Sequence, residues 1–560
     1  MRLGIKNNSN LTLLLLLIGF WIINLIQSTF TPLHYDEAYY WMFSQFPDWG
    51  YFDHPPMTSL FIHLGNLISN NELGVRFFIS IFQPLYLFIF WLLIKRDDFT
   101  QKDALMYFLI TASIPLLEIN GFIATPDVPL MLFSVIFLGC FEKYRSTNSY
   151  LWSILTGISM ALLAYSKYHG AIVVICALAA NLSLLKRPKT YLAAFIAILF
   201  LMPHFMWQYK NDFVSFKYHL SDRNKSFKAS YFFEYIGNVW VTLNPFLFPV
   251  FLSSLIGNRT KNPFEKTIKA VTIGFLLFFA LSSVRGHVQP QWILPASLGV
   301  TFWILLACKR TTKKNKYVQK ASLFSILLIA FIRLNLIFNW ISIPAMGFDN
   351  QKDMLAIQAI AKNNPVIMKS SYSRAALYNF YTDSQANSQQ EWSHRSSQYQ
   401  IWDIDSKWYN QPVIIEVAQS DSSITLPSGK VFSYIKNEHY IPTHKLEAEW
   451  NNPIHKLNND SMIIIESTIR NPYPFEITLG EKTNELEVDL VIHRKKQITE
   501  IIPLVDREII LPAKGEVQLL YEWNPKDNLH GDYELSYWIK NKPMEAWWAN
   551  KDTYKITFEN

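Results

Sequence analysis

The chain has 560 residues, of which 50% are hydrophobic and only 17% are charged. Soluble domains usually carry about 25% charged residues, so this composition excludes a protein that is soluble throughout. The formal charge of +7 says little as a total, because the charges are unevenly distributed. Apolar runs fill residues 11–340, whereas residues from 345 onward have the composition of a soluble protein.

The first apolar run, Leu11 to Phe30, has no charged residue and is long enough to cross the hydrocarbon core as a helix. Arg2 and Lys6 precede it, so a cleaved signal peptide is the alternative. A signal peptide has a shorter apolar core and a cleavage site of small residues, and residues 27–32 provide a poor one. We therefore predict an uncleaved first span.

Further spans are predicted for ten later apolar runs, which gives about eleven in all. They lie at 75–94, 104–123, 128–141, 150–166, 170–185, 190–208, 232–256, 268–284, 291–307 and 320–340.

The basic residues of the connecting loops predict the orientation of the chain. If the amino terminus is cytoplasmic, every cytoplasmic loop is basic, whereas the opposite loops 31–57 and 124–127 contain no Lys or Arg. This asymmetry is the positive-inside pattern, and it places the carboxyl-terminal part outside the cytoplasm. The exception is loop 209–231, which has five basic residues on the outer side: Lys210, Lys217, Arg223, Lys225 and Lys228. We favour a solvated surface loop; the alternative is a segment that admits or closes over a substrate.

The loop after the first span holds four acidic residues, Asp36, Glu37, Asp48 and Asp53, beside a membrane-length run that has none. Acidic side chains next to hydrocarbon are costly and point to function. Asp36 is a helix N-cap in one interpretation, with Glu37 at the positive end of the helix. In the other, Asp36 is a general base at the membrane surface.

Two other sites have paired interpretations. Asp53 and His54 precede a Pro-Pro pair, which either simply stiffens a turn or holds both side chains toward a sugar or phosphate. Lys167 lies where a span reaches the outer surface, so its ammonium either reaches into the headgroups or binds a lipid-linked phosphate. Arg285 and His287 between two later spans have the same two interpretations.

Residues 125–129 (Thr-Pro-Asp-Val-Pro) form a helix-start signal, with Asp127 predicted as the N-cap and a proline in the first turn. Asp127 is therefore more simply explained as a cap than as a catalytic residue.

Several motifs resemble glycosyltransferase family 39, which contains protein O-mannosyltransferase-like and lipid A aminoarabinose transferase-like enzymes of the GT-C fold. The motifs are Tyr35-Asp36-Glu37-Ala38-Tyr39-Tyr40-Trp41, Asp48-Trp49-Gly50-Tyr51-Phe52-Asp53-His54-Pro55-Pro56, Thr125-Pro126-Asp127-Val128-Pro129-Leu130 and Ser166-Lys167-Tyr168. The likeness covers residues 10–340, and residues 379–381 and 397–402 resemble the soluble domain of bacterial members.

The resemblance implies a polyprenyl-phosphate sugar donor and a site on the non-cytoplasmic face. It implies that Asp36 is the catalytic aspartate, that Asp127 is a second loop carboxylate and that Lys167 contacts the donor phosphate. We also predict a catalytic role for Glu37. The further contacts predicted with the donor phosphate or substrate are Asp53, His54, Tyr168, Arg285 and His287. The Asp53-His54-Pro55 turn stands where aminoarabinose transferases have Glu-Lys-Pro, so the charged residues differ.

The part after the membrane spans is predicted to hold two domains. An amphipathic helix at 349–363 and strands at 365–368 and 412–417 indicate a mixed α/β domain over 341–445. Alternating strands after 446 indicate an immunoglobulin-like β-sandwich over 446–560, which is not part of the family's usual plan. The membrane domain covers 1–340. No disulfide is expected in the soluble part, because Cys140, Cys176 and Cys308 all lie in the membrane half.

The predicted function is an inverting glycosyltransferase of the bacterial inner membrane that moves a sugar from a polyprenyl phosphate to an envelope glycolipid such as lipid A, another glycan or a protein hydroxyl. The expected partners are that donor, that acceptor and the bilayer, with no nucleic acid. No cofactor is predicted. A divalent metal at Asp36, Glu37, Asp53 and His54 stays open, because their spacing fits no specific coordination signature. The alternatives are a transporter or flippase of a lipid-linked saccharide, and a membrane anchor for a functional exported part.

Overall fold

The computed structural model divides the chain into two compact units, Met1–Asp349 and Asn350–Asn560, called here the membrane unit and the C-terminal unit. The predicted division at 445 falls within the second of them. The structure describes residues 8–222, 228–341, 343, 347–348, 350–382, 384–389, 394–453, 456–458, 462–480, 486–494, 497–503, 508–524, 529–541, 547–548 and 553–559.

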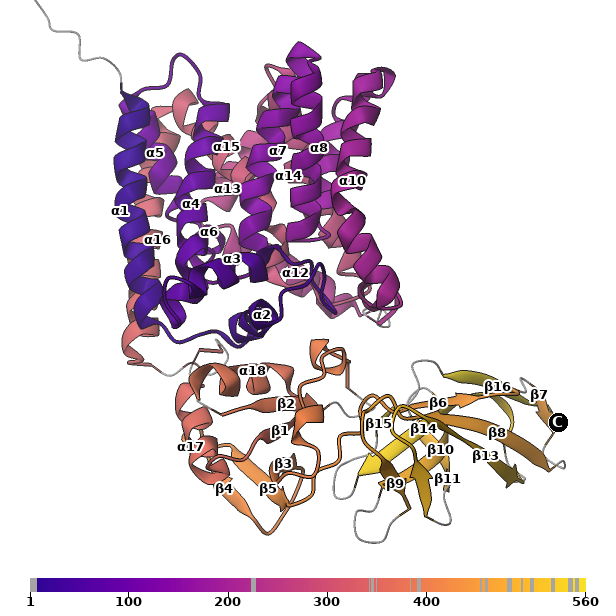
Figure 1. Cartoon of the computed structure of the whole chain (residues 1–560). Helices are drawn as coiled ribbons and strands as arrows, with labels where there is room; N and C mark the ends of the chain where they lie inside the picture. Colours follow the sequence, from indigo (N-terminus) through magenta and orange to yellow (C-terminus); the bar gives the residue numbers. More distant parts are fainter. Residues whose placement is uncertain are drawn as a thin grey trace, which may run out of the picture. The chain divides into compact units, whose positions relative to one another are not determined.

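The membrane unit is a bundle of helices that run side by side (Figure 1). Its helices are α1 (Ser9–Phe30), α2 (Tyr35–Gln45), α3 (Met57–Asn66), α4 (Glu72–Ile94), α5 (Gln101–Thr111), α6 (Pro115–Ile119), α7 (Asp127–Thr147), α8 (Tyr150–Ser166), α9 (Gly170–Ala179), η1 (Leu182–Lys186), α10 (Pro188–Lys210), α11 (Val214–Lys217), η2 (Tyr218–Asp222), α12 (Ala229–Thr242), α13 (Phe248–Gly257), α14 (Pro263–Ser282), η3 (Pro290–Ile293), α15 (Leu294–Arg310) and α16 (Thr312–Phe338).

Five helical segments of the described chain are long and apolar enough to cross a membrane: α1, α4, α10, η3 with α15, and α16. Each of the five contains or overlaps a predicted span. The remaining predicted spans correspond to shorter or more polar helices, so the total of eleven crossings stays a prediction.

Three predicted spans are not continuous helices. The span expected at 104–123 breaks between α5 and α6, where Pro115 starts a new helix, and the span expected at 232–256 breaks between α12 and α13. The span expected at 170–185 divides into α9 and the η1 turn. Asn244 adopts a left-handed conformation at the second break (φ 74°) and donates a hydrogen bond to the Ser113 carbonyl at the first (2.7 Å). Irregular backbone at membrane depth is tolerated where protein surrounds it. Here the Asn244 side chain at one break supplies a hydrogen-bond donor to a backbone carbonyl at the other.

A buried charged network ties α1, α6 and α16 together. Arg333 donates to Glu118 (2.8 Å) and to Asn24 (2.8 Å), and Asn24 donates to Gln83 of α4 (2.6 Å). A charge within hydrocarbon is costly unless it is paired and hydrogen-bonded, and every charge in this network has such a partner.

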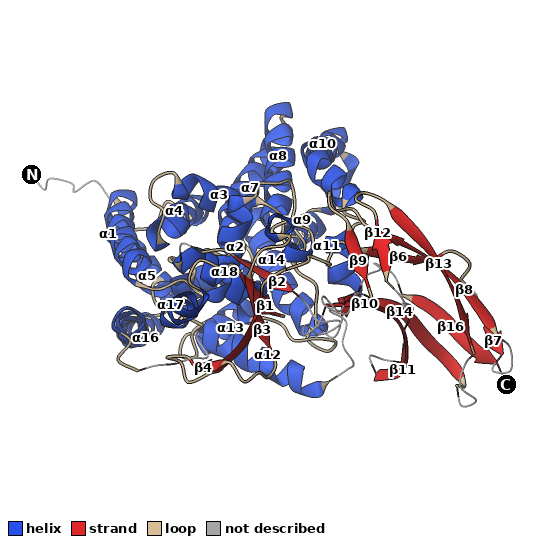
Figure 2. Cartoon of the chain, turned by 60° about the horizontal axis from the view of Figure 1, so that its bottom comes forward, coloured by secondary structure: helices blue, strands red, loops and turns tan. Residues whose placement is uncertain are grey.

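The C-terminal unit begins with a mixed sheet and two helices (Figure 2). Its strand order is β2-β1-β3-β5-β4; β1 pairs in parallel with β2 and β3, and β5 is antiparallel to β3 and β4. The elements are α17 (Gln351–Ala361), β1 (Val366–Lys369), α18 (Tyr372–Tyr381), β2 (Ala386–Gln389), η5 (Gln398–Gln400), η6 (Ser406–Trp408), β3 (Val413–Val417), β4 (Ser423–Thr425) and β5 (Val431–Asn437).

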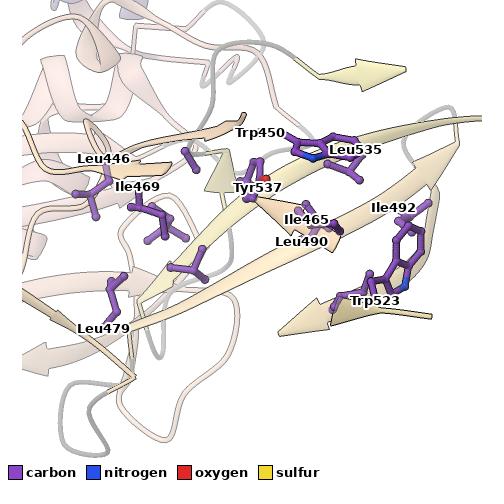
Figure 3. Close-up of a cluster of buried hydrophobic side chains, with 14 of the residues drawn as sticks. Leu446, Trp450, Ile465, Ile469, Leu479, Leu490, Ile492, Trp523, Leu535 and Tyr537 are labelled. Atoms are coloured by element: carbon purple, nitrogen blue, oxygen red, sulfur yellow. The ribbon is translucent and has the colours of Figure 1, made fainter. Parts of the chain in front are cut away.

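The rest of the unit is built from mainly antiparallel sheets around one apolar core (Figure 3), with β7 pairing in parallel with β16. Trp450, Ile465 and Trp523 of a three-stranded sheet (β13-β8-β6) share this core with Leu490 and Leu535 of a second sheet (β11-β10-β14-β16-β7). The strands are β6 (Glu447–Trp450), β7 (Lys456–Asn458), β8 (Ile463–Arg470), β9 (Ile477–Leu479), β10 (Leu486–Arg494), β11 (Gln497–Pro503), β12 (Ile509–Leu511), β13 (Glu516–Trp523), β14 (Gly531–Asn541), β15 (Trp547–Trp548) and β16 (Tyr554–Glu559).

A buried acid–base pair lies where these two parts of the C-terminal unit meet. His444 Nδ1 is 3.2 Å from Asp405 Oδ1, Tyr440 donates to the other oxygen of Asp405 (2.7 Å), and Tyr473 after β8 lies 3.3 Å from His444 Nδ1. Burial opposes both charges, but the two charges together with the hydrogen bonds outweigh it. The pKa of Asp405 is therefore lowered and the pKa of His444 is raised.

We expect this pair to make the local stability depend on pH. The Asp405 contribution is complete above its unfolded pKa of 3.8 and is lost as the pH falls through its lowered folded value. The His444 contribution is complete below its unfolded pKa of 6.5 and is lost as the pH rises through its raised folded value.

Hydrogen exchange of the full-length protein, corrected for intrinsic rates, should therefore show residues 402–410 better protected at pH 5.5 than at pH 8.5. His444→Gln should remove this difference. His439→Gln, which changes an exposed histidine bonded to Asn410, should leave it intact. Equal protection of the wild type at the two pH values would contradict the role given to the pair.

Candidate active site

Helix α2 carries the acidic motif and begins at Tyr35, two residues earlier than a helix capped by Asp36 would begin. Its N-cap is His34, whose Nδ1 accepts a hydrogen bond from the Asp36 N–H (3.2 Å), while the His34 N–H donates to Glu37 Oε2 (2.9 Å). Burial lowers the pKa of His34 to about 4, so the ring is neutral and Nδ1 is available as an acceptor. The predicted capping role of Asp36 is therefore wrong.

Glu37 is fully buried in a bidentate ion pair with Arg76 of α4. Its two oxygens accept from Arg76 Nε (2.7 Å) and Nη2 (2.6 Å), and Oε1 also accepts from the Ala124 N–H (2.8 Å). Arg76 further donates to the carbonyls of Ser28, Thr31 and Pro32. This clamp joins the end of α1, the start of α2, α4 and the loop before α7, which favours a structural role for Glu37.

Asp36 has a different environment from its neighbour. Its side chain is 27% exposed, and one carboxylate oxygen lies 3.8 Å from His34 Nδ1. Because α2 is fixed at its first turn by the cap and by the Glu37–Arg76 pair, the backbone of Asp36 is fixed too. The site thus presents a positioned and partly accessible carboxylate at the end of the membrane unit where α1 ends.

The loop after α2 is attached to the end of α10. Trp207 Nε1 donates to Asp48 Oδ2 (2.8 Å), and His204 Nδ1 lies 2.7 Å from the Trp49 carbonyl. A Cβ atom on Gly50 would lie 2.5 Å from the Trp207 ring, so only glycine fits between them. This contact gives a physical reason for the glycine in the first-loop motif.

Asp53 and His54 form a pair, with 3.0 Å between Asp53 Oδ1 and His54 Nδ1. Asp53 is buried, whereas the side chain of His54 is 20% exposed. His219 of η2 reaches the Asp53 carbonyl (3.0 Å), and its ring packs edge-on against Tyr168 (centroids 5.4 Å apart). Tyr168 also lies within hydrogen-bonding distance of His204 (3.1 Å).

Part of the predicted outer loop 209–231 is therefore folded against this site. Ser215 of α11 donates to the Tyr51 carbonyl (2.8 Å), and Tyr218 packs against Phe52. The described segment is thus not the solvated surface loop that the sequence favoured. Arg223 and Lys225 lie outside the described residues.

Asp127 and Lys167 pair with each other. Both oxygens of Asp127 lie 2.8 Å from Lys167 Nζ, and both side chains are buried. Lys167 therefore does not extend its ammonium into the headgroups. Asp127 is the first residue of α7 rather than its cap, which is Pro126, and its carboxylate accepts from Lys167. The Trp292 ring of η3 lies 5.9 Å from Lys167 Nζ.

Arg285 and His287 lie on the connection between α14 and η3. Arg285 is exposed, and His287 Nδ1 lies 3.1 Å from Glu234 of α12. His287 is thus paired with an acidic residue of α12. The connection itself leads directly to Trp292, which contacts the Asp127–Lys167 pair.

The sequence interpretation missed Arg76, His204, His219 and Trp292. Arg76 gave a detectable signal, since an arginine inside a predicted span needs a partner. The metal site left open at Asp36, Glu37, Asp53 and His54 gains no support. Among the described residues, three such ligand atoms lie within 4.8 Å of one another only at Asp403, Asp405 and His444.

Residues 53–207 match the family described as dolichyl-phosphate-mannose-protein mannosyltransferase. The predicted resemblance to glycosyltransferase family 39 is confirmed. This match begins at the Asp53-His54 pair and includes Arg76, Asp127, Lys167 and His204. A protein of Aquifex aeolicus (strain VF5), described as uncharacterized, is 25% identical over 302 residues. The aligned region is 51% of this chain and 59% of that relative's length.

Two solved structures share the fold of this glycosyltransferase-like chain. Both are ArnT from Cupriavidus metallidurans, one in the apo state and one bound to undecaprenyl phosphate. The apo structure has a TM-score of 0.53 at 13% identity and covers 72% of this chain and 92% of its own. The undecaprenyl phosphate complex has a TM-score of 0.54 at 15% identity, with 75% and 97% covered. The GT-C fold predicted for the membrane part is thus supported.

Proposed function

We propose that this chain is a membrane glycosyltransferase that takes its sugar from a polyprenyl phosphate. The observation that carries the proposal is the contrast within the Asp36-Glu37 motif. Both carboxylate oxygens of Glu37 are bound in the buried ion pair with Arg76. The same ion pair fixes the backbone of Asp36, whose carboxylate is partly exposed. A fixed, accessible carboxylate at a membrane boundary suits a general base. The ArnT structure with undecaprenyl phosphate supports a donor of this class.

The proposed reaction is a single displacement with inversion. An acceptor hydroxyl transfers its proton to Asp36 as its oxygen bonds to the anomeric carbon. The bond between that carbon and the phosphate oxygen breaks, and its electron pair leaves with the polyprenyl phosphate. Phosphate is a good leaving group, so no covalent intermediate on the protein is needed. An acceptor phosphate would already be ionised, and Asp36 would then position it.

Stabilisation of the departing phosphate falls to Lys167 in this proposal. An ammonium has three N–H donors, so Lys167 can bind a phosphate oxygen while it keeps one contact with Asp127. Donors aimed at the developing charge in a low-dielectric site lower the barrier most. His54 and Tyr168 are proposed to contact the donor. Arg285 and His287 remain proposed contacts that a movement of the 283–289 connection would have to bring to the phosphate.

Lys167→Ala should lower kcat/KM for the lipid donor by about 10- to 100-fold, because one charge-assisted contact contributes roughly 1.5–3 kcal/mol. The same change leaves the Asp127 carboxylate buried without its cation, so the melting temperature should fall as well. Donor-concentration kinetics and thermal unfolding in detergent measure the two effects.

The double variant Lys167→Ala/Asp127→Asn separates these effects. It removes the unpaired buried charge, so the melting temperature should return toward the wild-type value. The kcat/KM for the lipid donor should stay low. Recovery of donor use together with stability would show that Lys167 serves only to neutralise Asp127.

We propose that the acceptor is an envelope glycolipid, another glycan or a protein hydroxyl, and that the site faces away from the cytoplasm in a bacterial inner membrane. The positive-inside loops support this orientation. Mass spectrometry of envelope glycolipids from cells with and without the protein tests the proposal. A species heavier by one sugar residue should appear only with the protein, and identical spectra together with unmodified envelope proteins would contradict it.

Transport of a lipid-linked saccharide is the second candidate function. The two helix breaks that meet through Asn244 and Ser113 favour it, because transporters use discontinuous helices near the middle of the bilayer. The acidic cluster at one end of the unit favours transfer instead. Cleavage of the donor, as opposed to its intact movement across the bilayer, distinguishes the two.

A further inference from the structure

A basic cavity lies at the end of the membrane unit away from α2. It has a volume of about 590 Å³ and is formed by the end of α7, the η1 turn and the start of α14. Asp127 begins α7 at the proposed active site, and Arg145 of the cavity lies eighteen residues later, about 27 Å along the helix. The cavity is therefore separate from that site (Figure 1 shows α2 at one end of the bundle).

The charged residues that line this cavity are all basic. Arg145, Arg187, Lys261 and Lys266 line it, and no lining residue among those described is acidic. Arg145 is partly neutralised by Glu142 (2.7 Å), and the Arg187 guanidinium donates to the Arg145 carbonyl (2.9 Å), which fixes Arg187 beside the end of α7. Three loops whose basic residues also predict topology thus converge on a single cavity.

The start of α14 adds to this positive potential. Asn262 is the N-cap of this 20-residue helix, and it lines the cavity with Pro263. The acidic residue of the first turn, Glu265, is buried and is held by Arg96 and by the Lys261 N–H (2.8 Å). A helix N-terminus favours anions, and here it acts together with four basic side chains.

Exposed leucines lie at one side of the cavity, on the η1 turn. Leu182, which lines it, is 62% exposed, and Leu185 of the same η1 turn is 41% exposed. A site that joins exposed leucines to a basic hollow fits a molecule with an acyl chain and an anionic head. We propose that this cavity binds a phosphoryl anion, and the exposed leucines point to the headgroup of an anionic phospholipid as its source.

Retention of lipid by the purified full-length protein tests this proposal. The protein is exchanged into detergent with either phosphatidylglycerol or phosphatidylcholine, and bound lipid is counted by native mass spectrometry. Phosphatidylglycerol should be retained preferentially. The variant Arg187→Gln/Lys266→Gln should bind phosphatidylglycerol about fivefold more weakly for each charge removed. A separate arm measures thermal stabilisation by pyrophosphate, and stabilisation by pyrophosphate without lipid retention would identify a soluble phosphoryl ligand.

The matched control is Lys313→Gln/Lys316→Gln at the start of α16, which removes two lysines outside the cavity lining. This variant should retain phosphatidylglycerol like the wild type. A cooperative thermal unfolding transition of each variant, measured in detergent with phosphatidylcholine alone, shows that both variants are folded. The proposal is overturned if both lipids are retained equally and pyrophosphate has no effect, or if both variants lose the lipid to the same extent.

Discussion

Asp36→Asn should lower the rate of sugar transfer by about 10²- to 10⁴-fold, the usual contribution of a general base. Asparagine has nearly the same shape but cannot accept the acceptor's proton. The cap of α2 is His34, and the buried clamp is made by Glu37 and Arg76. The substitution should therefore leave the melting temperature close to that of the wild type. Initial rates with a polyprenyl-phosphate sugar and thermal unfolding of the same preparation measure both quantities.

Asp48→Asn is the matched control, because it makes the same change on the same outer loop. An asparagine oxygen can still accept from Trp207 Nε1, so transfer should stay near the wild-type rate. Normal turnover by Asp36→Asn would remove Asp36 from its role as base.

Arg76→Met should reduce the free energy of unfolding by about 3–5 kcal/mol, because it leaves the fully buried Glu37 carboxylate without its partner. The carbonyls of Ser28, Thr31 and Pro32 also lose a donor. Unfolding in mixed micelles of dodecyl sulfate and a neutral detergent measures this loss.

The double variant Arg76→Met/Glu37→Leu distinguishes a structural Glu37 from a catalytic one. Removal of both charges should restore most of the stability. Transfer should return with it if Glu37 only positions α2. A folded double variant with no activity would instead support the catalytic role that the sequence analysis predicts for Glu37. A loss below about 1 kcal/mol in Arg76→Met would contradict the clamp.

The positions of the long helices and of the acidic first loop could be predicted from the sequence, because both depend on local composition. The cap of α2 could not be predicted in the same way. Aspartate is a common N-cap and histidine is not, so the local pattern favoured Asp36. The buried Glu37–Arg76 pair fixes the first turn and moves the cap to His34.

The pairings of the charged residues depend on the tertiary fold. Lys167 is 40 residues from Asp127, and Arg333 is 215 residues from Glu118. No local pattern predicts such partners, so the sequence suggested phosphate binding for Lys167 without its link to Asp127. The helix breaks at Ser113 and Asn244 were also missed, because the hydrogen bond that links them joins residues 131 positions apart.

The central claim is that this chain breaks the bond between a sugar and a polyprenyl phosphate. The most direct measurement follows a labelled polyprenyl-phosphate sugar in vesicles that contain the purified protein and an envelope extract. We predict acceptor-dependent release of polyprenyl phosphate with gain of the label by an envelope molecule, and loss of both with Asp36→Asn. Donor that stays intact, or that crosses the bilayer uncleaved, would contradict the account.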